Sequence, residues 1–161
     1  LDKETSGAVL FAKNPFILPI LNRLLENKEI SREYWALVQG TFPKKHQIYT
    51  DKIGRNRHDR RKRLVDHKNG QYAETQVTKL KEIGNNTLVN CQLKTGRTHQ
   101  IRVHLAHHGY PIIGDPLYNS QNTERLMLHA HRLTFTHPFA LEKLSIEAFS
   151  ESFEEGLKKE N

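Results

Sequence analysis

Residues 93–104 of this chain read LKTGRTHQIRVH and mark the passage from a strand into a helix. The preceding segment, Thr87–Leu93, has the composition of a strand. Thr98 is a residue type that caps helix N-termini, so we expect a helix from Thr98 to His108. Gly109 follows where glycine often ends a helix. A strand that leads through a polar turn into a short helix therefore stands at the centre of the predicted fold.

The flanking sequence predicts mostly strands. Short apolar or alternating runs predict strands at Ala8–Ala12, Glu33–Val38, Glu74–Glu82, Leu126–Thr136 and Lys143–Ala148. An amphipathic stripe predicts one helix, which ends near Asn27 and contains Ile17, Ile20, Leu21, Leu24 and Leu25. Proline is tolerated in a first turn and not later, so we expect this helix to begin at Pro19.

These elements together predict an α+β fold with a mixed, largely antiparallel sheet flanked by helices. No internal repeat divides the chain, so we assign one domain to residues 1–150. The remaining residues, 151–161, are highly charged, and we expect a tail that is a short helix or disordered.

The overall charge narrows the choice of partner. The 161 residues include 25 Lys and Arg against 18 Asp and Glu, a formal net charge of +7. This balance favours a polyanion, either nucleic acid or an anionic membrane surface, and a solvated basic surface is the alternative. No stretch approaches the ~18 uninterrupted apolar residues of a membrane span. Cys91 is the single cysteine, which excludes an internal disulfide. The single cysteine and the absence of a signal-peptide pattern together predict a cytoplasmic protein.

A polar connection, residues 41–71, contains a cluster of arginines. They are Arg55, Arg57, Arg60, Arg61 and Arg63. So polar a run has little with which to build a core, and we expect a mobile loop or an extended arm. The arm is the best candidate in the chain for contacts to nucleic-acid phosphates, and a solvated loop is the alternative.

Two further segments complete a pattern with residues 93–104. Residues 1–7 read LDKETSG, an acid beside a polar turn, and residues 33–40 read EYWALVQG. In this order the three segments resemble the RluA-type pseudouridine synthases, which isomerise uridine in structured RNA. Segments 114–118 and 128–133 also resemble family segments, so the similarity extends to about Ala148. The His-Arg pair that precedes Leu-Asp in the family is absent, and we expect a catalytic domain without its N-terminal part.

The resemblance implies catalytic roles for three residues. Asp2 occupies the position of the family's nucleophilic aspartate. Arg102 occupies the position of the arginine that pairs with that aspartate. Tyr34 occupies the position of the tyrosine that stacks on the flipped base and assists in proton removal. Ordinary alternatives are a turn aspartate bonded to nearby backbone N–H groups, a surface arginine and a core tyrosine.

We expect the remaining contacts to substrate to be made by basic side chains. Arg97 lies close to the start of the predicted helix, where anions are favoured, and is expected to bind a phosphate. His99 is a second substrate-binding candidate. Since RNA recognition usually targets unstacked bases, the target uridine must be flipped into the pocket.

Histidines at helical spacing raise the question of a metal. His99, His104, His107 and His108 have spacings that can bind zinc on one helix. No carboxylate or cysteine lies nearby in sequence, and the resemblance accounts for the run without a metal. We therefore predict no metal and no cofactor.

The predicted function is isomerisation of specific uridines to pseudouridine by a monomeric enzyme, with ribosomal RNA as the first substrate class. The alternatives are a transfer-RNA pseudouridine synthase, and an RNA-binding or ribosome-assembly factor of the same fold without turnover. Intact Asp2, Tyr34 and Arg102 favour turnover, since a decayed site loses such residues.

Overall fold

The structure is a computed structural model that describes residues 1–119 and 124–160. The main sheet contains β1 (Ser6–Gly7), β2 (Ser31–Gln39), β3 (His46–Tyr49), β6 (Thr75–Ile83), β7 (Asn86–Leu93), β8 (Leu128–Thr136) and β9 (Lys143–Glu147). A small second sheet contains β4 (Ile53–Arg55) and β5 (Arg63–Val65). The helices are α1 (Ile17–Glu26), α2 (Gln100–His107) and α3 (Glu151–Lys159).

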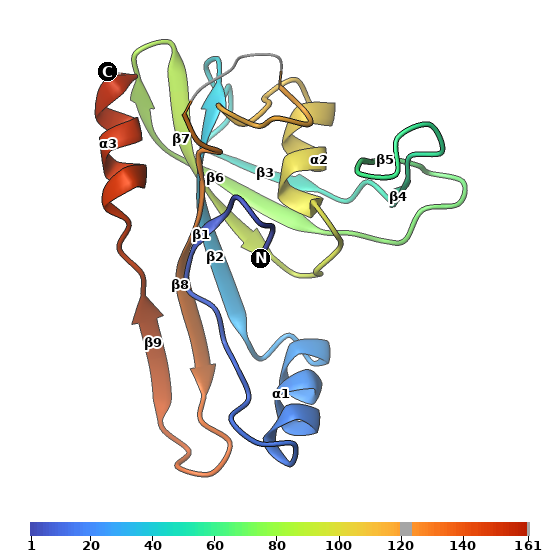
Figure 1. Cartoon of the computed structure of the whole chain (residues 1–161), viewed down its shortest axis with the longest axis vertical. Coiled ribbons are helices and arrows are strands. Elements are labelled where there is room, and N and C mark those ends of the chain that lie inside the picture. Colours follow the sequence, from blue (N-terminus) through green and yellow to red (C-terminus); the bar gives the residue numbers. More distant parts are fainter. Residues whose placement is uncertain (120–123, 161) are drawn as a thin grey trace.

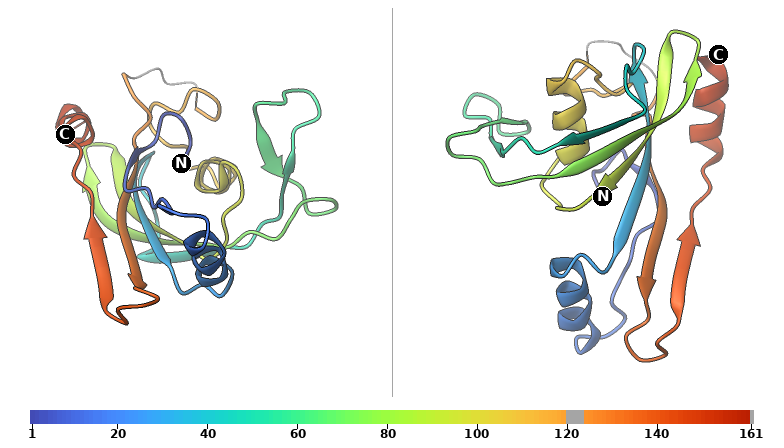
Figure 2. Two further views of the ribbon diagram at one scale, coloured as in Figure 1. Left: turned by 60° about the horizontal axis from the view of Figure 1, so that its bottom comes forward. Right: turned by 180° about the vertical axis from the view of Figure 1, so that it is seen from behind.

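The main sheet has the strand order β1-β8-β2-β7-β6-β3, with β9 paired to β8 (Figure 1). The β1–β8 pair is parallel and every other pair is antiparallel. In Figure 2, α2 and the N-terminal segment lie on the same face of the sheet, and the β4–β5 hairpin projects beyond α2. The predicted α+β class, with a mixed and largely antiparallel sheet, is confirmed.

The core is centred on β2 and β7. Ala36, Leu37 and Val38 on β2 are fully buried, because β2 lies between β7 and β8 and is covered on both faces. Ile101 and Leu105 of α2 belong to the same apolar cluster. A strand buried in this way reads as a continuous apolar run, as the sequence of β2 does.

The charged C-terminal segment forms the helix α3. Phe153 is 1% exposed, and it belongs with Leu157 to the main core cluster. Ser150 caps the helix by accepting a hydrogen bond from the Phe153 backbone N–H. Of the two states expected for residues 151–160, the helix is the one that forms, and its apolar side completes the core.

Helix α1 contains the predicted apolar stripe but begins two residues earlier than expected. It begins at Ile17, and Pro19 lies inside its first turn, where its missing N–H costs nothing. Leu21 is the buried residue of the helix, while Leu24 packs on a smaller apolar cluster around Leu133 and Phe135. Helix α1 thus covers the end of β8 that is far from α2.

The first strand was predicted at the wrong place. The strand pairing involves Ser6 and Gly7, and residues 8–12 continue without regular structure, alternating between half-buried and exposed. Gly7 explains the difference, because it has a φ of +118° and a Cβ there would lie 2.2 Å from the Ala130 carbonyl oxygen. Only glycine permits this close approach to β8.

Of the two expectations for residues 41–71, the mobile loop is wrong and the extended arm is the one that forms. This segment forms β3 and the β4–β5 hairpin, and three of its apolar residues are buried: Phe42, Tyr49 and Ile53. Ile53 packs with Ala73 and with Val103 of α2 in a cluster of its own. A few well-spaced apolar anchors therefore order a segment whose composition is otherwise polar.

Within the part of the chain that the structure describes, no helix has the length and apolar character needed to cross a bilayer.

Candidate active site

The N-terminal segment that carries Asp2 is fastened to the sheet. The Thr5 backbone N–H donates to the Asp2 carbonyl oxygen at 3.0 Å and closes a turn. Ser6 pairs with His129 in the parallel register, and the Ser6 Oγ is 2.9 Å from His129 Nδ1. These contacts hold Asp2 in place although it lies one residue from the start of the chain.

Arg102 connects Asp2 to a second carboxylate, Asp115. Its Nη1 donates to Asp2 Oδ2 at 2.8 Å, while Nε and Nη2 donate to the two oxygens of Asp115, each at 2.8 Å. The Arg102 side chain is 1% exposed, that of Asp115 is fully buried and that of Asp2 is 23% exposed. Arg102 thus binds Asp115 through Nε and Nη2, and Nη1 orients the Asp2 carboxylate, which is partly exposed to solvent.

The charge state of Arg102 follows from these contacts. Burial by itself disfavours the charged guanidinium, but its hydrogen bonds to the carboxylates of Asp115 and Asp2, together with their negative charges, outweigh burial and raise the pKa of Arg102. The expected pairing of Arg102 with Asp2 is present in the structure. Its support by Asp115 was missed, because residues 114–118 were assigned only to the pocket wall. The available signal was a carboxylate two residues after the apolar pair Ile112-Ile113.

A cavity of about 280 Å³ opens beside Asp2. Its lining brings together Asp2, Tyr34 and Arg102, the three residues expected to be catalytic, although they lie far apart in sequence. Apolar side chains complete the wall, from Leu93, Ile101 and Leu128. A cavity with a carboxylate, an aromatic ring and an apolar floor suits a planar base whose sugar faces the carboxylate.

Tyr34 retains its phenol proton at neutral pH. Burial raises the pKa of Tyr34, the Asp2 charge adds to this, and the nearby Arg32 opposes it. A neutral phenol is a hydrogen-bond donor and a stacking surface, and it is a poor base. Tyr34 can therefore offer its ring as a stacking surface and its hydroxyl as a hydrogen-bond donor.

Arg32 is a second residue of this cavity that the sequence did not single out. One guanidinium nitrogen donates to the Thr95 carbonyl oxygen at 3.3 Å, while Nε is buried and has no hydrogen-bond partner among the residues that the structure describes. The guanidinium passes over Gly96, where a Cβ would lie 2.9 Å from Arg32 Nη1. Burial lowers the pKa of Arg32, and this cation has unused hydrogen-bonding capacity at the cavity wall.

His99 lies at the entry of α2. It has a φ of +56° and is the N-cap residue, and helix α2 begins at Gln100, so the prediction of Thr98 as the cap is wrong. The side chain of Gln100 ties down the turn, because its Oε1 accepts from Arg97 N and from Thr95 Oγ1. This internal cap replaces the expected threonine.

The turn at the start of α2 places His99 against the catalytic aspartate. His99 Nε2 lies 4.0 Å from Asp2 Oδ2, and Nδ1 lies 2.8 Å from the Tyr118 hydroxyl. Burial lowers the pKa of His99, and the charge of Asp2 opposes this. His99 therefore lines the pocket as expected.

Three of the arginines expected to bind RNA surround one hollow. Arg55, Arg63 and Arg97 line a cavity of about 370 Å³ next to the catalytic one. Arg55 and Arg63 lie directly opposite each other across the β4–β5 pair. Like charges in this position repel, so a bound anion would stabilise the pair. Arg97 is anchored through Nε to the Tyr72 carbonyl oxygen.

The other three arginines of the hairpin lie near its tip. Arg57 and Arg60 are exposed. Arg61 forms a salt bridge with Asp59 at 2.8 Å and also lines a hollow that contains Asp2 and His99. Arg61 thus brings the hairpin next to Asp2 and His99.

A family model described as "RNA pseudouridylate synthase" matches residues 1–107 of this chain. The chain belongs to the RNA pseudouridylate synthase family. The matched residues include Asp2, Tyr34 and Arg102, whereas Asp115 lies outside the match.

Other pseudouridine synthases resemble the chain in sequence and in fold. It is 40% identical over 151 residues to an uncharacterized RNA pseudouridine synthase, YlyB, of Bacillus subtilis, covering 92% of this chain and 50% of that protein. It is 39% identical over 165 residues to ribosomal large subunit pseudouridine synthase D of Neisseria meningitidis, covering 92% and 43%. The solved structure of human RNA pseudouridylate synthase domain containing 1 matches with a TM-score of 0.80 at 27% identity, covering 93% of this chain and 66% of that one.

The chain spans about half the length of the curated pseudouridine synthases that it matches.

Proposed function

We propose that this chain carries the catalytic centre of an enzyme that isomerises uridine to pseudouridine in RNA, with Asp2 as the nucleophile. The observation that carries the proposal is the Asp2 carboxylate, held at 2.8 Å by Arg102 in the wall of a cavity that Tyr34 also lines. Turnover requires an aimed carboxylate and a place for a flipped base, and both lie at this one position.

The reaction is an isomerisation, so its atoms balance within the substrate. The bond between C1′ and N1 of uridine breaks, the base rotates, and C1′ bonds to C5. The hydrogen on C5 leaves as a proton, and N1 gains one. Asp2 supports the step in which C1′ loses its base, as an attacking group or as a counter-charge, and Arg102 keeps the carboxylate oriented throughout. Tyr34 offers a face on which the detached uracil can stack.

We propose ribosomal RNA as the first substrate class. Several similar proteins are named for the ribosomal large subunit, among them pseudouridine synthase D of Neisseria meningitidis and pseudouridine synthase C of Buchnera aphidicola. The arginines around the neighbouring hollow provide contacts to the backbone of a structured RNA. A monomer remains our expectation for the oligomeric state.

The test is release of tritium from RNA labelled at C5 of uridine, with wild type compared to Asp2→Asn. Because the C5 hydrogen must leave before pseudouridine can form, release follows the chemistry itself. We expect Asp2→Asn to reduce the rate by at least about 10³-fold, as removal of a nucleophile typically does. Glu29→Gln, which alters an exposed carboxylate beside α1, serves as the matched control and should release tritium at the wild-type rate.

Each outcome separates the candidate functions. Release from ribosomal RNA and not from transfer RNA supports the proposal, whereas the reverse preference makes the protein a transfer-RNA enzyme. Undiminished release by Asp2→Asn contradicts the assignment of the nucleophile. Salt-sensitive RNA binding by a folded wild-type protein that releases no tritium indicates an RNA-binding factor of the same fold.

A further inference from the structure

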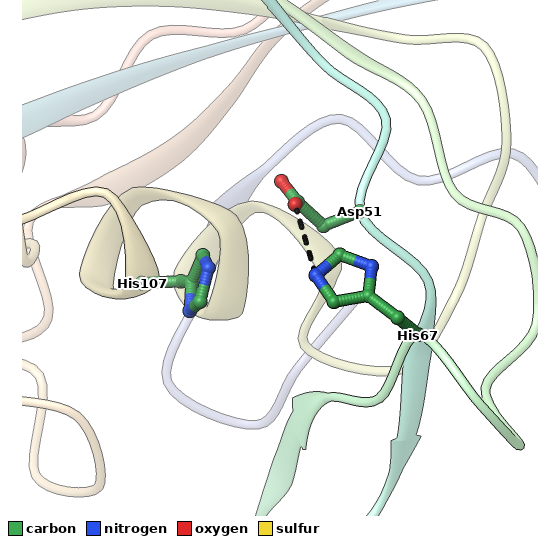
Figure 3. Close-up of side chains that lie close together, drawn as sticks. All are labelled: Asp51, His67 and His107. Atoms are coloured by element: carbon green, nitrogen blue, oxygen red, sulfur yellow. Dashed lines mark ion pairs between the residues drawn. The ribbon is translucent and has the colours of Figure 1, made fainter.

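A second cluster of polar side chains lies at the other end of α2, away from the uridine pocket. Asp51 follows β3, His67 follows β5 and His107 is the last residue of α2. One potential ligand atom from each of these three residues lies within 4.8 Å of the others. Figure 3 shows the two imidazoles and the carboxylate facing a common space.

Asp51 is held in position before any ligand binds. His108 Nε2 donates to Asp51 Oδ2 at 2.7 Å, and the His108 ring stacks on Tyr49 with 3.9 Å between centroids. The other oxygen, Oδ1, lies 3.7 Å from His67 Nε2. The carboxylate therefore has one oxygen oriented by a histidine and one directed at the cluster, as in metal sites whose ligands are fixed by a second layer of hydrogen bonds.

The backbone of Asp51 is fixed as well, through a buried histidine. His104 Nε2 is 2.9 Å from the Asp51 carbonyl oxygen, so this nitrogen carries the proton and donates. Nδ1 of His104 then accepts from the Thr75 hydroxyl at 2.9 Å. Burial lowers the pKa of His104, which is consistent with this neutral tautomer.

We propose that Asp51, His67 and His107 bind a divalent transition metal ion, with zinc as the fitting ion. Two imidazoles and one carboxylate match zinc chemistry, and a water molecule would complete a tetrahedron. Zinc bonds to these atoms are about 2.0–2.2 Å, so two ligand atoms on one ion are at most about 4.4 Å apart. Small rotations of His67 and His107, which are exposed, bring the three atoms within this limit.

Metal binding at this site would affect the position of the arginine-containing β4–β5 hairpin. Asp51 and His67 flank the β4–β5 hairpin at its two ends, whereas His107 belongs to the helix that carries Arg102. An ion bound to all three fastens the base of the arginine hairpin to α2. Without the ion, that junction consists of the small apolar cluster of Ile53, Ala73 and Val103 and of the hydrogen bonds from His104 and His108 to Asp51. Metal binding would thus restrict how the hairpin arginines move relative to the uridine pocket.

The experiment titrates metal-free wild-type protein with Co²⁺ and with Zn²⁺. We expect a visible Co²⁺ absorption band at one equivalent, displaced by Zn²⁺, and a rise in the thermal midpoint of about 8 °C at a Zn²⁺ concentration a hundred times the dissociation constant. His67→Ala and His107→Ala should each weaken binding at least tenfold. His58→Ala, an exposed histidine on the same hairpin, is the matched control and should bind as wild type does.

Two results would overturn the proposal. Absence of a Co²⁺ band with folded wild-type protein would leave Asp51 with its histidines as a metal-free polar network. Equal binding by wild type, His67→Ala and His107→Ala would place the ion elsewhere. Both readouts are independent of uridine turnover, so the site can fail while the isomerase proposal stands, and the reverse also holds.

Discussion

The molecule contains two groups of arginines that are built in opposite ways. Arg102 is 1% exposed and donates three hydrogen bonds to two carboxylates. Arg55 and Arg63 lie opposite each other on a projecting hairpin, and among the described residues neither forms a salt bridge with a carboxylate. The guanidinium of Arg102 is paired within the protein, whereas those of Arg55 and Arg63 can pair with a bound partner.

The buried arginine is suited to holding other side chains in place, and the exposed arginines are suited to binding RNA phosphates. A buried charge is tolerated only when it is fully paired, so the carboxylates around Arg102 lock one geometry. Exposed cations keep their freedom and gain affinity by displacing counterions from a phosphate backbone. The contrast predicts that changes near Arg102 alter folding and turnover, whereas changes in the hairpin alter RNA affinity.

The largest effect is expected when the buried cluster is broken. Asp115→Asn leaves the Arg102 guanidinium with a neutral partner in a fully buried position. We expect a loss of about 3 kcal/mol of unfolding free energy, and a thermal midpoint about 10 °C lower, together with slower tritium release. Asp59→Asn, which breaks the exposed pair with Arg61, should leave the midpoint almost unchanged. Equal midpoints for the two variants would contradict the contrast.

An intermediate effect is expected from the aromatic wall of the pocket. Tyr34→Phe keeps the ring and removes the hydroxyl, so RNA affinity should persist while tritium release slows by about 10- to 100-fold. Tyr72→Phe provides the control, since this tyrosine is exposed and its hydroxyl bonds Glu74. Full activity in Tyr34→Phe would restrict the residue to stacking and leave proton transfer to another group.

The smallest effect is expected in the hairpin. Changing both Arg55 and Arg63 to Gln removes two cations from the hollow that they share with Arg97. The slope of log affinity against log salt concentration should fall by about 2, with the rate at saturating RNA unchanged. Arg23→Gln on α1 is the control, because this exposed arginine lies in another part of the fold. An unchanged slope would show that the hairpin does not contact the RNA backbone.

Much of the fold could be predicted from local patterns. The strands β2, β6, β7 and β8 lie where alternation and apolar runs placed them, within about two residues, and α1 follows its stripe. Local composition misled over residues 41–71, where three buried apolar residues, Phe42, Tyr49 and Ile53, order the segment. Ile53 is ordered by Val103, fifty positions away, and no window of sequence contains that contact.

The sequence by itself indicated the family and the class of fold, and it nominated Asp2, Tyr34 and Arg102, which the structure brings together in the lining of one pocket. It could do so because these depend on residue types at short spacing: an acid before a turn, a tyrosine in an apolar strand, an arginine on a short helix. Asp2 and Arg102 nevertheless meet across 100 positions of the chain.

Only the tertiary structure decided which groups support them. Asp115 became the partner of Arg102 because the loop after Ile113 passes beneath α2, and Asp51 joined His67 and His107 because the hairpin folds back on the same helix. The physical reason is burial, because a charge removed from water costs free energy unless the fold places a side chain of opposite charge beside it.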